Sequence, residues 1–330
     1  MRSVIRRARA EFKADDVTDL AAALTYYGVL AIVPGMIVLV AVIGLVGANS
    51  AQLLHQVSVV APGSAAQVIQ TLIRQAQHHH GGAGIAAIAG LVVALWSASG
   101  YVAAFMRAAN RVYDIGEGRP IWKKAPLRLA LTLFAVVMLV VMAALVVVTG
   151  SVARTVGNAI GVGGTAVTVW DIAKWPVLVV LISVLLAVLF WATPNAKQAG
   201  IKWISPGGVL ATVAWLVVSA IFALYVSDFS SYNRTYGSMA GIVVFLVWLW
   251  LTNVSLLFGL ELNAELERER AVEQGLPEGV EPFAEPRDTR KMSEEQRRAV
   301  EESLEVRRRT IGSDGSAPIA APAPNPRAPR

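Results

Sequence analysis

The chain contains no cysteine and only four histidines among its 330 residues. Without thiols it cannot form disulfides, cysteine-ligated zinc or iron–sulfur sites, or a cysteine nucleophile. Three histidines are consecutive, at 78–80, and two glycines follow them. A metal site needs three or four ligands held in fixed geometry, so this run favours a solvated loop over a metal centre. The sequence therefore predicts neither a metal nor another cofactor.

Charge is also scarce, because only 16% of the residues are charged against about 25% in ordinary soluble domains. Hydrophobic residues make up 55% and fall into long runs without charge. About 20 apolar helical residues cross a bilayer, and these runs lack the alternation of barrel strands. We therefore expect an all-α, polytopic membrane protein with a bundle of six transmembrane helices. The expected spans are 22–46, 85–105, 129–150, 175–194, 205–227 and 238–260.

The positive charges alternate with the expected spans. Arginine and lysine concentrate before the first span, in the second and fourth connections, and after the sixth span. This is the pattern of the positive-inside rule with both termini in the cytoplasm. It also accounts for the net charge of +6 without nucleic acid. The expected partner is the lipid bilayer, with anionic lipid as a candidate partner for the basic cytoplasmic segments.

The chain divides into three predicted regions: a cytoplasmic lead-in at 1–20, a membrane domain at 21–265 and a cytoplasmic tail at 266–330. The lead-in has the pattern of one amphipathic helix over 4–20. The first outer connection, residues 48–82, predicts two short helices on either side of Pro62-Gly63. In the tail, a capping-box pattern at Ser293 opens a charged helix ending near Arg309. The rest of the tail is rich in proline and charge and is expected to be disordered.

Polar residues within or beside the apolar runs are candidates for a pathway or for the bundle interior, because polar groups in lipid are costly and tend to face inward. Each has a simpler interpretation, as an interfacial tyrosine, a helix-to-helix hydrogen bond or the polar end of a span. Glu261 and Glu265 share a helix face and repel, so an arginine at 107, 111 or 128 is expected nearby. The candidates are Tyr26, Tyr27, Asn110, Asn253, Glu261, Asn263 and Glu265.

Two further patterns bear on the helices. Pro34, Pro176 and Pro206 are candidate helix breaks, a common feature of transport paths. Small residues recur every fourth position in the second span and again at Gly237 and Gly241, a spacing that favours close helix packing. In a chain this rich in alanine and glycine, the same spacing also arises from composition alone.

Several segments together resemble the YihY/BrkB family of bacterial inner-membrane proteins. They are the run 20–27 followed by Pro34, Trp96-Ser97-Ala98-Ser99-Gly100, Pro206-Gly207 and the run 259–265 with its Glu-Leu-Asn-Ala-Glu ending. The resemblance covers about residues 10–268. It implies six membrane helices and a link to envelope properties such as serum resistance. The family has no agreed catalytic residues, so none is carried over.

Three function classes remain open. A transporter or flippase-like protein for an envelope component or ligand is favoured by the polar groups in the spans. A structural or scaffolding membrane protein, acting through its basic tail, is the second class. A membrane enzyme is third, with Glu261 and Glu265 as its only candidate acid–base pair. The resemblance also brings a ribonuclease label, since many family members were once labelled ribonuclease BN, but the sequence disfavours it. This chain lacks a His-x-His-x-Asp-His pattern, and metal-dependent hydrolysis needs such a preorganised ligand set.

Overall fold

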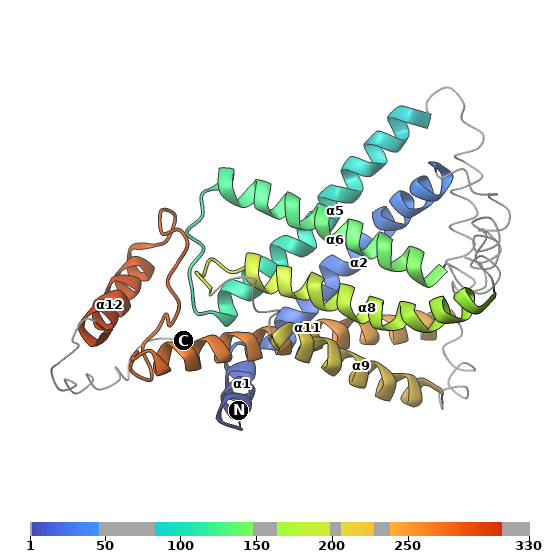
Figure 1. The fold of residues 1–330 in the computed structure, drawn as a ribbon. Helices are drawn as coiled ribbons and strands as arrows, with labels where there is room; N and C mark the ends of the chain where they lie inside the picture. The colour runs from blue at the N-terminus through green and yellow to red at the C-terminus, as the bar shows by residue number, and fades with distance from the viewer. Residues whose placement is uncertain (1, 46–82, 148–163, 199–205, 228–237, 312–330) are drawn as a thin grey trace. The chain divides into compact units, whose positions relative to one another are not determined.

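The computed structural model describes residues 2–45, 83–147, 164–198, 206–227 and 238–311. Within these ranges the regular structure is helical, and the only β feature is an isolated bridge between Ala196 and Pro286. This confirms the all-α prediction for the described residues. The helices, shown in Figure 1, are α1 (Arg2–Ala14), α2 (Val17–Leu45), α5 (Ala83–Val112), α6 (Ile121–Val147), α8 (Gly164–Ala192), α9 (Pro206–Ser227), α11 (Ser238–Glu273) and α12 (Glu294–Ile311).

Four helical segments are long and apolar enough to cross a bilayer: Ile121–Val146, Val169–Ala192, Gly207–Val226 and Gly241–Glu273. At a rise of about 1.5 Å per residue, each covers the hydrocarbon core. Helices α2 and α5 coincide with the first two predicted spans but are not among these four. The described residues therefore contain four candidate membrane spans, while the count of six stays a prediction.

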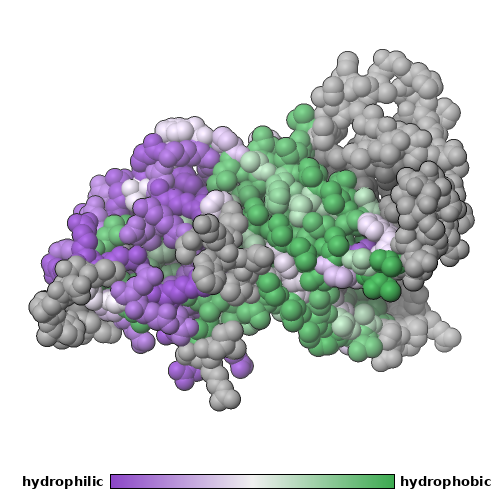
Figure 2. Space-filling model, in the orientation of Figure 1, coloured by the Kyte–Doolittle hydropathy of each residue, from purple (hydrophilic) through white to green (hydrophobic). Residues whose placement is uncertain are grey.

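The surface of these helices supports a lipid environment. On α9, Ile221 and Leu224 are 61% and 70% exposed, and on α6 Leu133 is 53% exposed. Soluble proteins rarely leave contiguous apolar patches of this kind in water. Figure 2 shows the hydrophobic surface over the apolar helices, and hydrophilic residues gathering around α12 and the charged end of α11.

The chain forms two compact units. Unit 1 comprises residues 1–22, 105–125 and 186–330, and unit 2 comprises residues 23–104 and 126–185. The division passes through α2, α5, α6 and α8. Unit 1 therefore contains both termini, α9, α11 and α12, together with the ends of four other helices.

The predicted single lead-in helix over 4–20 is wrong. Helix α1 ends at Ala14, and α2 begins at Val17 after a turn in which Asp16 has φ = 51°. Aspartate tolerates this left-handed conformation better than most residues, so the turn is permitted locally. In unit 1, α1 packs on α11, with the Phe12 and Phe258 rings edge to face at 6.1 Å and with Val4 and Ala8 buried. The amphipathic face predicted for this helix is therefore covered by protein.

The tail is more ordered than predicted. Helix α11 continues past residue 265 to Glu273, and the segment that follows, residues 274–293, buries Phe283 and Met292. We call residues 274–293 the strap. Helix α12 then starts with the predicted capping box: Gln296 N donates to Ser293 Oγ at 3.2 Å, and Ser293 N donates to Gln296 Oε1 at 3.1 Å. Disorder of the tail up to residue 311 is thus contradicted, and residues 312–330 lie outside the described residues.

The predicted breaks at proline are not seen as helix ends inside the spans. Helix α8 continues through Pro176, and the helical range of α2 includes position 34. Pro206 is the first residue of α9, where its missing N–H would have no partner within the helix. The expected outer-loop helices, together with the histidines at 78–80, lie outside the described residues.

Candidate functional site

Close packing of α9 on α11 positions the polar residues of α11. A Cβ added at Gly259 would lie 2.2 Å from the Ala211 Cβ, and one added at Gly207 would lie 2.5 Å from the Gly259 carbonyl oxygen. The two helices can approach each other this closely only because both positions are glycine. The contact continues toward Asn263, whose Cβ lies beside Gly207. One helical face of α11 is therefore fixed against α9 just before the charged residues begin.

Tyr113 lies directly after α5 and links that segment to α11. Its hydroxyl oxygen accepts hydrogen bonds from Asn263 Nδ2 at 2.9 Å and from Gln198 Nε2 at 2.8 Å. Its ring stacks on Phe283 of the strap at 5.7 Å. Burial raises the pKa of Tyr113 well above its usual range, so the phenol stays neutral. Asn263, predicted as an interior polar residue, is 6% exposed and bonded here.

Asn195 holds the strap onto the connection after α5. It is fully buried, and its Nδ2 donates to the Gly116 carbonyl at 2.9 Å and to the Asp288 carbonyl at 2.7 Å. Its Oδ1 accepts from Asp288 N at 3.2 Å, and its backbone N donates to Asn110 Oδ1 at 2.7 Å. All polar atoms of this side chain are thus used to join three chain segments, and Asn110 supports it from α5.

A buried arginine fixes the same connection. Arg119 is 6% exposed, and it forms two parallel bonds to Glu117 at 2.8 Å each while donating to the Thr193 carbonyl at 2.8 Å. Burial raises the pKa of Glu117, but the bonds and charge of Arg119 outweigh it and leave that pKa below the usual value. Bidentate arginine–carboxylate pairs are among the stronger hydrogen bonds in proteins. The Asn110 amide also donates to Glu117, at 3.3 Å.

Asp288 of the strap is surrounded by basic groups. Arg290 donates to it at 2.7 Å and Lys123 at 3.1 Å. The hydrogen bonds from Arg290 hold the pKa of the Asp288 carboxyl well below its usual range. A Cβ at Gly118 would lie 1.8 Å from the Asp288 carbonyl oxygen, so the strap crosses Gly118 in direct contact. The strap is therefore fixed by both charge and close backbone approach.

Glu265 lies in an ion-pair cluster at the charged end of α11. It is 2% exposed and lies 3.2 Å from both Arg7 Nε and Arg268 Nε. The partner expected for the Glu261 and Glu265 pair was an arginine near α5, but Arg111 pairs with Asp15 instead, at 3.3 Å. The expectation failed because the lead-in folds back as α1 and supplies Arg7.

Glu261 is the most deeply buried acidic residue of the described chain, at 1% exposure. Its carboxyl interacts with that of Asp15 in the turn between α1 and α2. Glu261 Oε1 has no hydrogen-bond partner among the described residues. Burial raises the pKa of Asp15, although Arg111 acts against this. Nearby, burial and then the charges of Glu281 and Asp15 raise the pKa of Asp114 to about 7.

The two predicted tyrosines belong to unit 2. Tyr26 is 61% exposed and lies edge to face with Tyr27, with ring centroids 5.4 Å apart. A Cβ at Gly100 would be 3.4 Å from the Tyr27 ring, so α2 and α5 meet there. The other five predicted residues, including Asn253 at 1% exposure, lie in unit 1. The structure therefore groups the candidates within two separate units rather than in one site.

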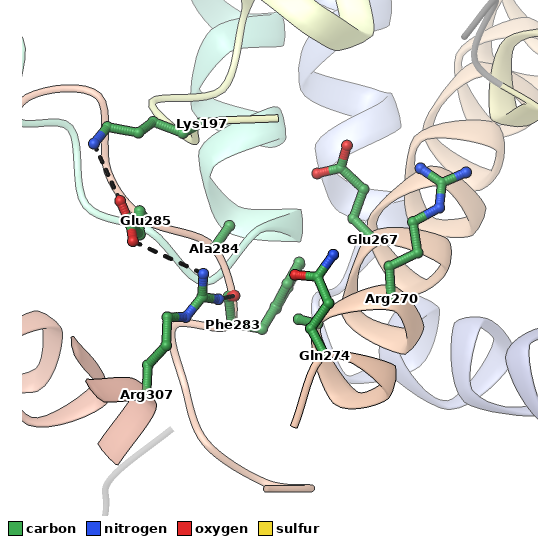
Figure 3. A pocket seen from close by; sticks show the side chains of 9 residues that line it. Lys197, Glu267, Arg270, Gln274, Phe283, Ala284, Glu285 and Arg307 are labelled. Atoms are coloured by element: carbon green, nitrogen blue, oxygen red, sulfur yellow. Dashed lines mark hydrogen bonds and ion pairs between the residues drawn. The ribbon is translucent and has the colours of Figure 1, made fainter. Parts of the chain in front are cut away.

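A cavity of about 160 Å³ lies beside the charged end of α11 (Figure 3). Lys197 and Arg307 converge on Glu285 of the strap, while Glu267 and Arg270 project from α11. None of the seven predicted polar residues lines this cavity. The polar groups of Asn110, Asn263 and Glu265 instead serve buried contacts within the protein.

Sequence reasoning missed Asp15, Asp114, Asn195, Arg119 and Asp288. The first two have one weak signal, an aspartate directly after an amphipathic or basic helix, where a turn is favoured. Asn195 follows a proline at the end of an apolar run, which indicates only a turn. Their importance comes from partners 73 to 165 residues away in the chain.

The chain is similar to known proteins over most of its length. The family model described as virulence factor BrkB matches residues 8–281. The ribonuclease-like protein YfkH of Bacillus subtilis is 29% identical over 249 residues, which cover 76% of this chain and 90% of that protein. A UPF0761 membrane protein of Stenotrophomonas maltophilia is 28% identical over 82% of this chain and 62% of its own length, and one of Pseudomonas aeruginosa is 35% identical over 82 residues, 20% of its length. No solved structure shows significant similarity.

Proposed function

The protein belongs to the virulence factor BrkB family, and from this premise we propose that it transports or flips an envelope component or ligand across the bacterial inner membrane, with both termini in the cytoplasm. The observation that carries the proposal is the series of buried polar side chains along α11. Asn253, Glu261 and Asn263 are 1%, 1% and 6% exposed on a helix whose outer surface is apolar. Polar and ionisable groups at such positions are costly in a membrane, which makes a functional role the default interpretation.

The proposed transport role does not rest on broken helices. Helix α8 is continuous through Pro176, so the pathway would have to form by movement of packed helices rather than at a preformed break. The contact between α9 and α11 through Gly207 and Gly259 is close, and it fixes one face of α11. Movement on the opposite side, where α1 and the turn at Asp15 meet α11, fits this arrangement best.

The test is complementation in the native host after deletion of the gene. Glu261→Gln and Asn253→Ala are expected to lose the envelope phenotypes at wild-type protein levels. Ser255→Ala is the matched control, since Ser255 is also buried on α11 but its hydroxyl bonds to the Leu251 carbonyl within the same helix. If Glu261→Gln and Asn253→Ala both restore every phenotype, the assignment of a pathway to α11 is wrong.

A scaffolding function is the second candidate, supported by the ordered strap and α12. Arg307 of α12 donates to the Phe283 carbonyl at 2.7 Å, which couples α12 to the strap. Truncation after Met292 removes α12 while leaving Asp288 and Phe283 in place. Loss of function with a wild-type melting temperature would favour scaffolding over transport.

We propose no enzymatic activity, although the Bacillus relative is named ribonuclease-like. Within the described ranges, no group of three or more histidine, aspartate or glutamate side chains is arranged to hold a metal ion. Glu265, Glu117 and Asp288 each bind an arginine. Carboxylates already neutralised in this way are poor candidates for acid–base work.

A further inference from the structure

The Glu261 carboxyl differs from every other buried carboxyl described above. Glu265, Glu117 and Asp288 all have a basic side chain within 3.3 Å. Glu261 has no ion pair in the described part of the chain. Glu261 Oε1 and Glu265 Oε2 both have no hydrogen-bond donor there, but Glu265 Oε2 lies 3.2 Å from Arg7 Nε, so only Glu261 has no compensating charge. An isolated buried carboxylate costs several kcal/mol or more, so such a group takes up a proton instead.

The contact with Asp15 points the same way. The two carboxyls lie within interaction range of each other. An ionised carboxylate only accepts hydrogen bonds, so a bond between these two carboxyls requires a proton on one of them. Asp15 already accepts from Arg111 Nε at 3.3 Å, which favours its ionised form. In such a bond Glu261 is the donor and Asp15 the acceptor.

The surrounding charges do not supply a replacement for this proton. The acidic groups that face the pair outnumber the basic ones. Arg7 and Arg268 are engaged by Glu265, and Arg111 pairs with Asp15, so one arginine balances one charge of the pair and Glu261 has no basic partner. Like charges around one carboxyl favour its neutral form. The groups facing Glu261 and Asp15 are Arg7 and Glu11 of α1, Arg111 of α5, Tyr113 and Asp114 after α5, Glu265 and Arg268 of α11, and Glu281 of the strap.

We propose that Glu261 and Asp15 form a proton-binding site that joins the turn between α1 and α2 to α11, and, resting on the proposed transport function, that this proton is the coupling ion. Water supplies the proton and receives it again on release. Release leaves two negative carboxylates in contact, which drives the turn away from α11 on the side opposite the fixed contact with α9.

The proton itself is tested by infrared spectroscopy on the purified full chain in lipid nanodiscs. A protonated carboxyl absorbs at a C=O frequency distinct from that of a carboxylate. Wild type is expected to show this band at pH 7 and to lose it at alkaline pH. Because Asp114, with a pKa of about 7, also contributes to the band, Asp114→Asn is the reference protein, and adding Glu261→Gln to it is expected to abolish the band. Glu265→Gln is the matched control, because Glu265 is equally buried one turn later but paired with two arginines, and it is expected to retain the band.

Absence of the band from wild type at pH 7 overturns the proposal, as does its loss in Glu265→Gln with retention in Glu261→Gln. If Glu261→Gln does not fold, Asp15→Asn serves instead, and it is expected to shift the frequency of the band without removing it. An unchanged band in Asp15→Asn overturns the shared site. A positive infrared result combined with full complementation by Glu261→Gln leaves the proton site standing and removes the transport function, so the two failures are distinguishable.

Discussion

The two parts of α11 are held in place by different interactions. Up to Leu260 the helix is apolar, and glycine and alanine bring it into close contact with α9. From Glu261 onward it is charged, and hydrogen bonds and ion pairs to α1, Tyr113 and the strap position it. In lipid, apolar burial gives little driving force between helices, so close packing must provide the contact. Near water, polar groups can be solvated in the unfolded chain, so only specific partners fix the structure.

The largest effect is expected at the apolar contact. Gly259→Ala places a Cβ 2.2 Å from that of Ala211 and 2.9 Å from the Gly207 carbonyl, and α9 must move away. Overpacking of this kind costs about 1–3 kcal/mol, so the melting temperature in detergent is expected to fall by several degrees.

Gly241→Ala is the matched control, because an added Cβ there meets nothing within 4 Å. Its melting temperature should equal or slightly exceed that of wild type. Equal losses in both variants would show that helix packing does not distinguish the two positions. The open surroundings of Gly241 also contradict the predicted small-residue contact at that position.

At the polar end, Asn195→Ala is expected to release the strap. The change leaves the Asp288 N–H and the Gly116 and Asp288 carbonyls without their partner, at a cost of about 1–3 kcal/mol. Limited proteolysis should cut within residues 281–292 faster than in wild type. Lys197→Ala is the control. Lys197 lies two residues after Asn195, and its substitution removes only an exposed ion pair with Glu285, so the cleavage rate should stay unchanged. Equal cleavage rates in wild type and Asn195→Ala would show that Asn195 does not hold the strap in place.

A smaller loss is expected from Tyr113→Phe. The ring can still stack on Phe283, but Asn263 Nδ2 and Gln198 Nε2 each lose one acceptor, although Gln198 keeps its bond to the Phe190 carbonyl. Loss of these two hydrogen bonds is expected to cost about 1–2 kcal/mol, measured as a shift of the denaturation midpoint in detergent. Tyr26→Phe, at a tyrosine that is 61% exposed on α2, is the control and should unfold as wild type does. A Tyr113→Phe protein as stable as wild type would contradict the hydroxyl's linking role.

The smallest effect concerns pH. The pKa of Asp114 is about 7 in the folded protein against 3.8 ordinarily, so between these values the folded state holds a proton that the unfolded chain has lost. Stability contributed by this proton is complete below pH 3.8, falls as the pH rises toward 7, and is absent above it. Asp114→Asn should therefore lessen the fall of the melting temperature between pH 5 and about 7.

Asp16→Asn is the control for this measurement. Asp16 also has positive φ, 51° against 48° at Asp114, and its side chain is 71% exposed. Asparagine tolerates the same backbone conformation, so strain is matched in the two variants. Identical pH profiles for Asp114→Asn and wild type would exclude Asp114 as the titrating group.

The candidate site was predictable in part. Glu261, Asn263 and Glu265 stand out because charge and amide groups interrupt an apolar helix, and the capping box at Ser293 is a local pattern that the structure confirms. The turn at Asp15 was not predictable, since the pattern continues across it and only packing of α1 on α11 defines the end of the helix. The strap was mistaken for disorder because its composition is polar, while its order depends on Asn195 from a distant segment.

The sequence by itself determined that this protein is helical, that it lies in a membrane and to which family it belongs, because long apolar runs and charge distribution act through the solvent and need no partner. Only the tertiary structure decided that Glu265 pairs with Arg7 and Arg268 while Glu261 faces Asp15. Two glutamates four residues apart on one helix are equivalent in the sequence. What distinguishes them is which side chains the rest of the chain places beside each.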